Sequence, residues 1–160
     1  MQQGTSGMAP LIVMVAGWVA FRLLGAVGLI NAASSWSGAL RFALAAMFAF
    51  TALSHFLPRT RPDLVRMVPP RLPNPGLLVT VTGVLEFSGA VGLLVPPLIR
   101  ASSYALMLLL LALFPANVHA ARMRLLVAGR PATPLVIRLP LQLFWMGALW
   151  WVARAGAGAA

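Results

Sequence analysis

The amino-acid sequence predicts an all-α protein, a polytopic membrane helix bundle. Apolar residues make up 61% of the 160-residue chain, the mean hydropathy is +0.91, and the apolar residues gather in five long runs that contain few charges. Soluble domains are about 45–50% apolar. A bilayer core about 30 Å thick is crossed by about 20 apolar helical residues, which is close to the length of each run.

We predict a single transmembrane domain over residues 8–154, between a polar N-terminal tail at residues 1–7 and a C-terminal tail at residues 155–160. Within this domain, the apolar runs place five membrane spans at residues 8–30, 38–57, 76–96, 101–121 and 134–153.

The first and last spans need separate arguments. Residues 8–30 resemble a signal peptide in position, but no basic residue precedes the apolar core and Arg22 interrupts it, so we expect a retained helix. The last span contains Pro140, and a helix beginning there would be too short to cross. We therefore expect a kinked helix that begins near Pro134.

Arginine supplies all of the basic charge, and the formal net charge is +10. The arginines are spread over short loops between apolar runs, which favours anionic lipid head groups over nucleic acid as their partner. Seven arginines follow the second and fourth spans, whereas Arg41, Arg100 and Arg154 lie on the opposite side. The positive-inside rule then predicts a cytoplasmic N-terminus and an outside C-terminus.

The chain has no cysteine, which excludes dithiol exchange, thiolate metal sites and cysteine-held iron–sulfur clusters within this chain. No cluster of carboxylates and histidines suits a metal ion, so no metal site is predicted. His55 and His119 stand at matched depth on different spans, the arrangement of a bis-histidine haem, but nothing else in the sequence marks a haem pocket. A redox role would therefore need another bound cofactor or a partner.

Polar residues from several spans gather toward one side of the membrane. His55 lies two residues before the end of the second span, Asn117 lies near the end of the fourth, and Arg138 and Gln142 enter the fifth from the same side. Glu86 lies about 15 Å into the third span, near the midplane. We predict that these five residues face a polar pocket within the bundle, because intramembrane polar groups avoid lipid.

Glu86 needs a partner at its depth. Arg22 is the basic residue predicted at a comparable level, and we expect an ion pair between the two. Gly83 and Gly89 lie on the same helix face as Glu86, where small residues let another helix approach closely. The alternative is that Glu86 only clamps helices together through hydrogen bonds.

Pro115 predicts a kink in the fourth span, because proline donates no backbone hydrogen bond and leaves the carbonyl of Leu111 open. Asn117 could serve that carbonyl or reach across to another helix. His119 points away from Asn117 in a regular helix, so we expect it to face the head groups or a neighbouring helix.

The loop at residues 58–75 contains six prolines and cannot be helical throughout. Between the prolines, residues 62–68 can form two helical turns in the head-group layer. Such a segment is either a lid over the pocket or a proline-stiffened connector.

Several segments resemble the DoxX family of small bacterial integral membrane proteins, in the order found there. They read RFALAAMFAFTALSHF, MVPPRLPNPGLLVTVTGVLEFSGAVGLLVP, LALFPANVHAAR and RLPLQLFWMGALWW, and they cover about residues 38–154. The resemblance implies a four-helix DoxX-like core in a bacterial cell membrane, with the first span as an addition. It also implies characteristic positions at His55, Glu86, Pro115, Asn117, Arg138 and Gln142.

The resemblance further implies an association with respiratory or thiol-linked redox chemistry, since relatives are named for a subunit of a thiosulfate to quinone oxidoreductase. We expect an accessory subunit that is not catalytic alone, with a quinone bound in the polar pocket and other membrane redox subunits as partners. Two alternatives stay open: a pocket for a lipid or another apolar small molecule, and a scaffold protein without a ligand.

Overall fold

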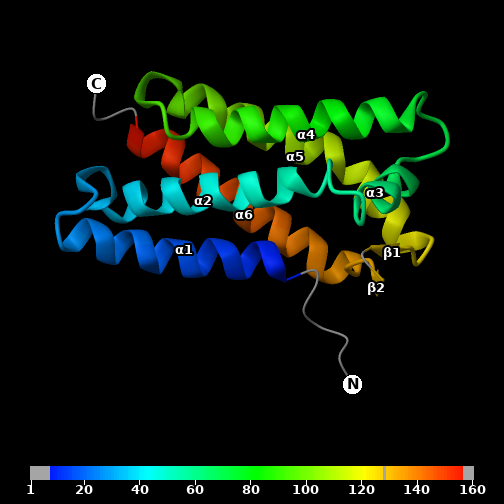
Figure 1. The fold of residues 1–160 in the computed structure, drawn as a ribbon, viewed down its shortest axis with the longest axis horizontal. Helices are drawn as coiled ribbons and strands as arrows, with labels where there is room; N and C mark the ends of the chain where they lie inside the picture. The colour runs from blue at the N-terminus through cyan, green and yellow to red at the C-terminus, as the bar shows by residue number, and fades with distance from the viewer. Residues whose placement is uncertain (1–7, 128, 157–160) are drawn as a thin grey trace.

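The computed structural model describes residues 8–127 and 129–156, and within them the chain is almost entirely helical (Figure 1). The helices are α1 (Ala9–Ala26), α2 (Trp36–Leu53), α3 (Arg61–Met67), α4 (Pro75–Gly92), α5 (Ile99–Arg122) and α6 (Leu135–Ala155). Two short 3₁₀ turns, Asn31–Ala33 and Pro96–Leu98, precede α2 and α5. The strands β1 (Leu126–Val127) and β2 (Arg130–Pro131) pair antiparallel between α5 and α6.

Five of these helices are long and apolar enough to cross a membrane, which confirms the predicted all-α polytopic membrane bundle. The helices α1, α2 and α4 end a few residues before the predicted spans do, because apolar residues continue into the turns that follow. Hydropathy indicates whether a residue lies within the membrane, whereas the end of a helix is defined by its backbone hydrogen bonds. The predicted tail at residues 1–7 and most of the C-terminal tail lie outside the described residues.

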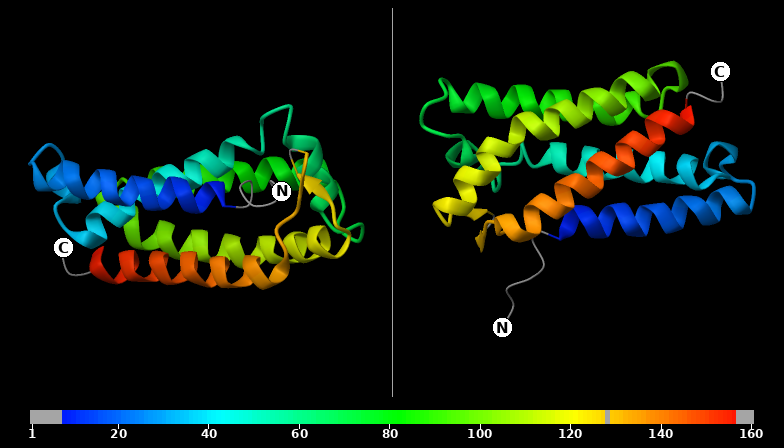
Figure 2. Two further views of the ribbon diagram at one scale, coloured as in Figure 1. Left: turned by 90° about the horizontal axis from the view of Figure 1, so that it is seen from below. Right: turned by 180° about the vertical axis from the view of Figure 1, so that it is seen from behind.

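The helices α2, α4, α5 and α6 form a four-helix core in which each helix contacts two others. The helix α2 contacts α4 and α6, and α5 contacts the same two helices. The helix α1 packs against α2, outside this ring. Figure 2 shows α5 and α6 together in a layer behind the layer of α1, α2 and α4. The four-helix core with one additional N-terminal helix is therefore present.

The core is filled by apolar side chains from all four core helices, among them Phe48, Ala90, Leu106 and Leu149, each at most 2% exposed. Many large apolar residues instead face outward along the spanning helices. On a soluble protein such a surface would aggregate. On these helices it is the surface that contacts lipid.

The prolines inside α5 and α6 do not end these helices. The helix α5 runs from Ile99 through Pro115 to Arg122, and α6 begins directly after Pro134 and continues through Pro140. In Figure 2 α5 changes direction in its second half, which is the bend expected where a proline removes a backbone hydrogen bond.

One end of the bundle is closed by α3 and the β1–β2 hairpin (Figure 1). The helix α3 occupies the segment where two helical turns were predicted, with Pro62 in its first turn, where the missing N–H group costs nothing. Asp63 in the first turn and Arg66 in the last form an ion pair one turn apart.

Candidate functional site

A cavity of about 420 Å³ lies at the end of the bundle covered by α3 and the hairpin. Its walls come from α2, α3, α4, α5 and α6, with Pro10 of α1 and the hairpin at the edge, and they are mostly apolar. Four of the five predicted pocket residues border it: His55, Glu86, Asn117 and Arg138. The fifth, Gln142, is not in its lining. Tertiary packing thus gathers polar groups from four separate segments around one space.

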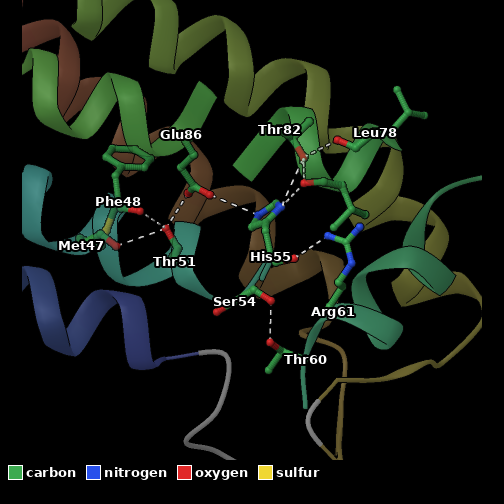
Figure 3. Close-up of polar contacts among 11 residues, drawn as sticks. Met47, Phe48, Thr51, Ser54, His55, Thr60, Arg61, Leu78, Thr82 and Glu86 are labelled. Carbon is green, nitrogen blue, oxygen red and sulfur yellow. Dashed lines mark hydrogen bonds and ion pairs between the residues drawn. The ribbon is translucent and has the colours of Figure 1, made fainter. Parts of the chain in front are cut away.

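Two ionisable residues at this cavity, His55 and Glu86, lie against each other (Figure 3). The distance from His55 Nε2 to Glu86 Oε2 is 3.3 Å, and both residues are more than nine-tenths buried. The Thr51 hydroxyl donates to Glu86 Oε1 at 2.5 Å. Glu86 is thus held by Thr51 in the C-terminal part of α2 and by His55 in the turn that follows. The contact from His55 to Oε2 is within ion-pair distance, but Oε2 has no partner with hydrogen-bond geometry within the described residues.

The hydrogen bonds of His55 determine how many protons the pair holds. Nδ1 lies 2.9 Å from the carbonyl oxygen of Val79, and a carbonyl only accepts, so Nδ1 carries hydrogen. A bare Nε2 lone pair facing an ionised carboxylate would be repulsive. One proton therefore lies between Nε2 and the Glu86 carboxyl group, either as imidazolium with carboxylate or as imidazole with carboxylic acid, and the pair is neutral in both forms.

Close packing and backbone contacts hold His55 in place. A Cβ atom on Gly83 would lie 2.6 Å from Cβ of His55, so this close approach needs glycine. Arg61 on α3 donates from Nη1 to the His55 carbonyl at 2.9 Å, and from Nη2 to the Gly76 carbonyl at 3.1 Å and to the Thr80 hydroxyl at 2.9 Å. These bonds tie the turn after α2 to α3 and to the first turns of α4.

The predicted ion pair between Arg22 and Glu86 is wrong. The guanidinium group of Arg22 lies over the Trp36 ring, 5.1 Å from its centroid, at the opposite end of α2 from His55. Because α1 packs on α2 outside the four-helix core, its side chains do not line the α2–α4 interface. His55 supplies the partner instead. Membrane depth estimated from residue counts favoured Arg22, because it placed His55 near the end of its span and Glu86 near the midplane.

Gln142 has a structural role, contrary to its predicted place in the pocket. It is 4% exposed, and Nε2 donates to the carbonyl of Leu110 on α5 at 3.0 Å. Leu110 lies one residue before Leu111, whose carbonyl Pro115 was predicted to leave open. An amide on α6, rather than Asn117 on α5, therefore supports the backbone of α5 near its proline.

Three polar groups at the cavity lack partners within the described residues. Asn117 is 8% exposed and its side chain has no hydrogen bond there. Arg138 Nε and Trp145 Nε1 are buried with no hydrogen-bond partner, and both residues line the cavity. An unpaired buried donor costs about 1–3 kcal/mol. These groups belong to residues of the cavity wall, and the surrounding protein does not use them in hydrogen bonds within the described residues.

Trp145 was missed by the sequence reasoning, although a signal was present. It follows Arg138 and Gln142 at helical spacing, seven and three residues on, and so lies on the face of α6 that carries both. His119 is partly buried and is absent from the lining within the described part of the chain. No group of three or more potential metal ligands occurs among the described residues.

Five helices able to cross a membrane, with an ionisable pair and unpartnered donors around an internal cavity, define a multi-pass membrane protein with a polar site inside its bundle. Residues 44–153 match the family described as Domain of unknown function (DUF8561), and the chain belongs to this family. The matched segment begins within α2 and ends within α6, so it coincides with the four-helix core and omits α1. Neither the curated proteins nor the solved structures contain a match to this chain.

Proposed function

We propose that the chain is an accessory subunit of a membrane redox system and that its cavity holds the head group of a quinone. One observation carries the proposal. The unpartnered Asn117, Arg138 and Trp145 border the same cavity as the His55–Glu86 pair, inside a bundle whose outer surface suits lipid. Its volume of about 420 Å³ lies within the range of about 300–1,000 Å³ typical of small-molecule sites.

The chemistry of the lining matches a quinone. Quinone oxygens only accept hydrogen bonds, and the side chains of Asn117, Arg138 and Trp145 can donate them. Phe48, Leu110 and other apolar residues supply walls for the ring and for the start of an isoprenoid tail. Reduction of a quinone takes up protons as well as electrons, and the His55–Glu86 pair lies at the same cavity.

The DoxX resemblance supports the redox setting, since it carries an association with quinone-linked oxidoreductases. The chain has no cysteine, so in this proposal the electrons come from a partner subunit. We further propose a bacterial cell membrane, with the cavity in the cytoplasmic half. The arginine-rich loops before α4 and after α5 lie at the cavity end of the bundle, and the positive-inside rule places such loops in the cytoplasm.

A second candidate is a lipid with an acidic head group, which Arg138 favours. The Glu86 carboxyl group is already matched by His55, so within the described residues the guanidinium of Arg138 has no carboxylate partner. A lipid carboxylate or phosphate would supply one.

The test is to identify and then rebind the occupant. The protein is purified in a mild detergent, and co-extracted molecules are analysed by mass spectrometry; short-chain ubiquinone and menaquinone are then titrated into it. We expect a stoichiometric quinone, with weaker binding in Asn117→Ala and Trp145→Phe. The matched control is Trp150→Phe, an exposed tryptophan on the same helix. A bound acidic lipid with no quinone binding would favour the second candidate, and an empty protein that binds neither would favour a scaffold.

A further inference from the structure

We infer that the His55–Glu86 pair is the proton donor to the bound quinone, with Glu86 giving its proton to a quinone oxygen and His55 receiving the replacement. This inference rests on the proposed function and specifies the chemistry of the same site. Its basis is geometric: two buried ionisable groups share one proton at the wall of a cavity that also holds unpartnered hydrogen-bond donors.

The two forms of the pair suit different occupants. A quinone oxygen only accepts, so it favours the form in which Glu86 is a carboxylic acid that can donate to it, and His55 is neutral. A quinol hydroxyl can donate, so it favours the carboxylate form of Glu86 with His55 as imidazolium. The single proton therefore moves between the two partners according to the oxidation state of the occupant.

The reaction balances when the redox partner subunit of the proposed function acts as the reductant. That partner supplies two electrons to the quinone. Glu86 supplies one proton to a quinone oxygen, water supplies the other proton of the quinol, and a third proton from water restores the pair on His55. The quinone takes up two electrons and two protons, and the pair holds one proton before and after.

Charged groups around the pair allow this shift. Arg61 on α3 binds the His55 carbonyl and Arg138 on α6 lines the same cavity. The helix α5 contributes only uncharged residues to the lining, Asn117 among them. The positive charge of Arg61 disfavours an imidazolium on His55, whereas that of Arg138 favours the carboxylate form of Glu86. The two effects oppose each other across the pair, so the occupant of the cavity can decide which form prevails.

The composition of the chain makes the test unusually direct. Glu86 is the sole glutamate, and His55 and His119 are the only histidines. ¹³C-labelled glutamate therefore reports Glu86 alone in the infrared spectrum, and ¹⁵N-labelled histidine in the His119→Gln variant reports His55 alone. Cell-free synthesis prevents the label from being transferred to other amino acids. The sample is loaded with short-chain ubiquinone and then reduced with dithionite at neutral pH.

We expect a labelled carboxylic-acid band in the quinone-loaded protein that gives way to a carboxylate band on reduction. The ¹⁵N signals of His55 should change from a neutral imidazole with hydrogen on Nδ1 to an imidazolium. Glu86→Gln should retain quinone binding, since an amide also donates, but should shift the preference from quinol toward quinone by about tenfold, the effect of one lost hydrogen bond to a charged group.

The outcomes separate the two ideas. Failure of the wild-type protein to bind the ubiquinone overturns the proposed function and this inference with it. Binding with labelled signals that are the same in both oxidation states overturns the inference alone. A Glu86→Gln variant that does not fold leaves the wild-type spectra to decide.

Discussion

Replacing Gly83 with alanine tests whether close packing holds the His55–Glu86 pair together. The added Cβ would lie 2.6 Å from Cβ and 2.9 Å from Cγ of His55, and 3.0 Å from Cε2 of Phe56. Carbon atoms prefer separations of about 3.5–4.0 Å, so His55 must move by about 1 Å. The displaced imidazole of His55 would no longer contact the Glu86 carboxyl group.

The cost follows from this displacement. Overpacking of a buried site costs about 1–3 kcal/mol. For a chain of this size, 1 kcal/mol corresponds to about 2–4 °C in melting temperature. We therefore expect Gly83→Ala to lose about 2 kcal/mol of free energy of unfolding and to melt about 4–8 °C below the wild type. Tryptophan fluorescence or circular dichroism in detergent gives the melting curve.

The matched control is Gly147→Ala on α6, where an added Cβ meets no atom within 4 Å. This change should leave stability unchanged or raise it by up to about 1 kcal/mol, because alanine favours helix. In the double variant Gly83→Ala, His55→Gly, the closest colliding atom, Cβ of His55, is gone, so adding Gly83→Ala to His55→Gly should cost less than adding it to the wild type. Equal melting of Gly83→Ala and the wild type would refute the packing argument, and so would additive losses in the double variant.

Three further predictions concern the contacts around the cavity. Arg61→Met removes the bonds to the His55 and Gly76 carbonyls. Because charged hydrogen bonds are worth about 1.5–3 kcal/mol each, hydrogen exchange and proteolysis in α3 should become at least about tenfold faster. Unchanged protection of α3 would contradict this. Gln142→Leu removes the hydrogen bond from α6 to the Leu110 carbonyl and should lower the free energy of unfolding by about 0.5–1.5 kcal/mol. Denaturant or thermal unfolding measures the change, and a neutral effect would show that the bond does not support α5. Arg22→Ala removes the contact with the Trp36 ring and should lower the free energy of unfolding by at most about 1 kcal/mol. It should leave the labelled Glu86 infrared band in place, and a shift of that band would instead indicate an interaction between Arg22 and Glu86.

The sequence determined the fold class and the number of crossing helices. Hydropathy over about 20 residues is a strong local signal, because the bilayer requires it of every spanning segment independently. The short helix α3 was also predictable, since prolines on either side of residues 62–68 leave room for two turns. The same local reasoning brought His55, Asn117 and Arg138 to one end of the bundle, because each is near that end of its own span, while it placed Glu86 near the midplane.

Tertiary structure alone decided which of these residues touch. Residue counts give depth along the membrane normal but not the angle around it, and the angle determines which helices are neighbours. Arg22 matched Glu86 in estimated depth, yet α1 packs outside the four-helix core, so His55 became the partner. Gln142 turned to the backbone of α5, and Trp145 came to line the cavity, because contacts between helices depend on packing that no single segment encodes.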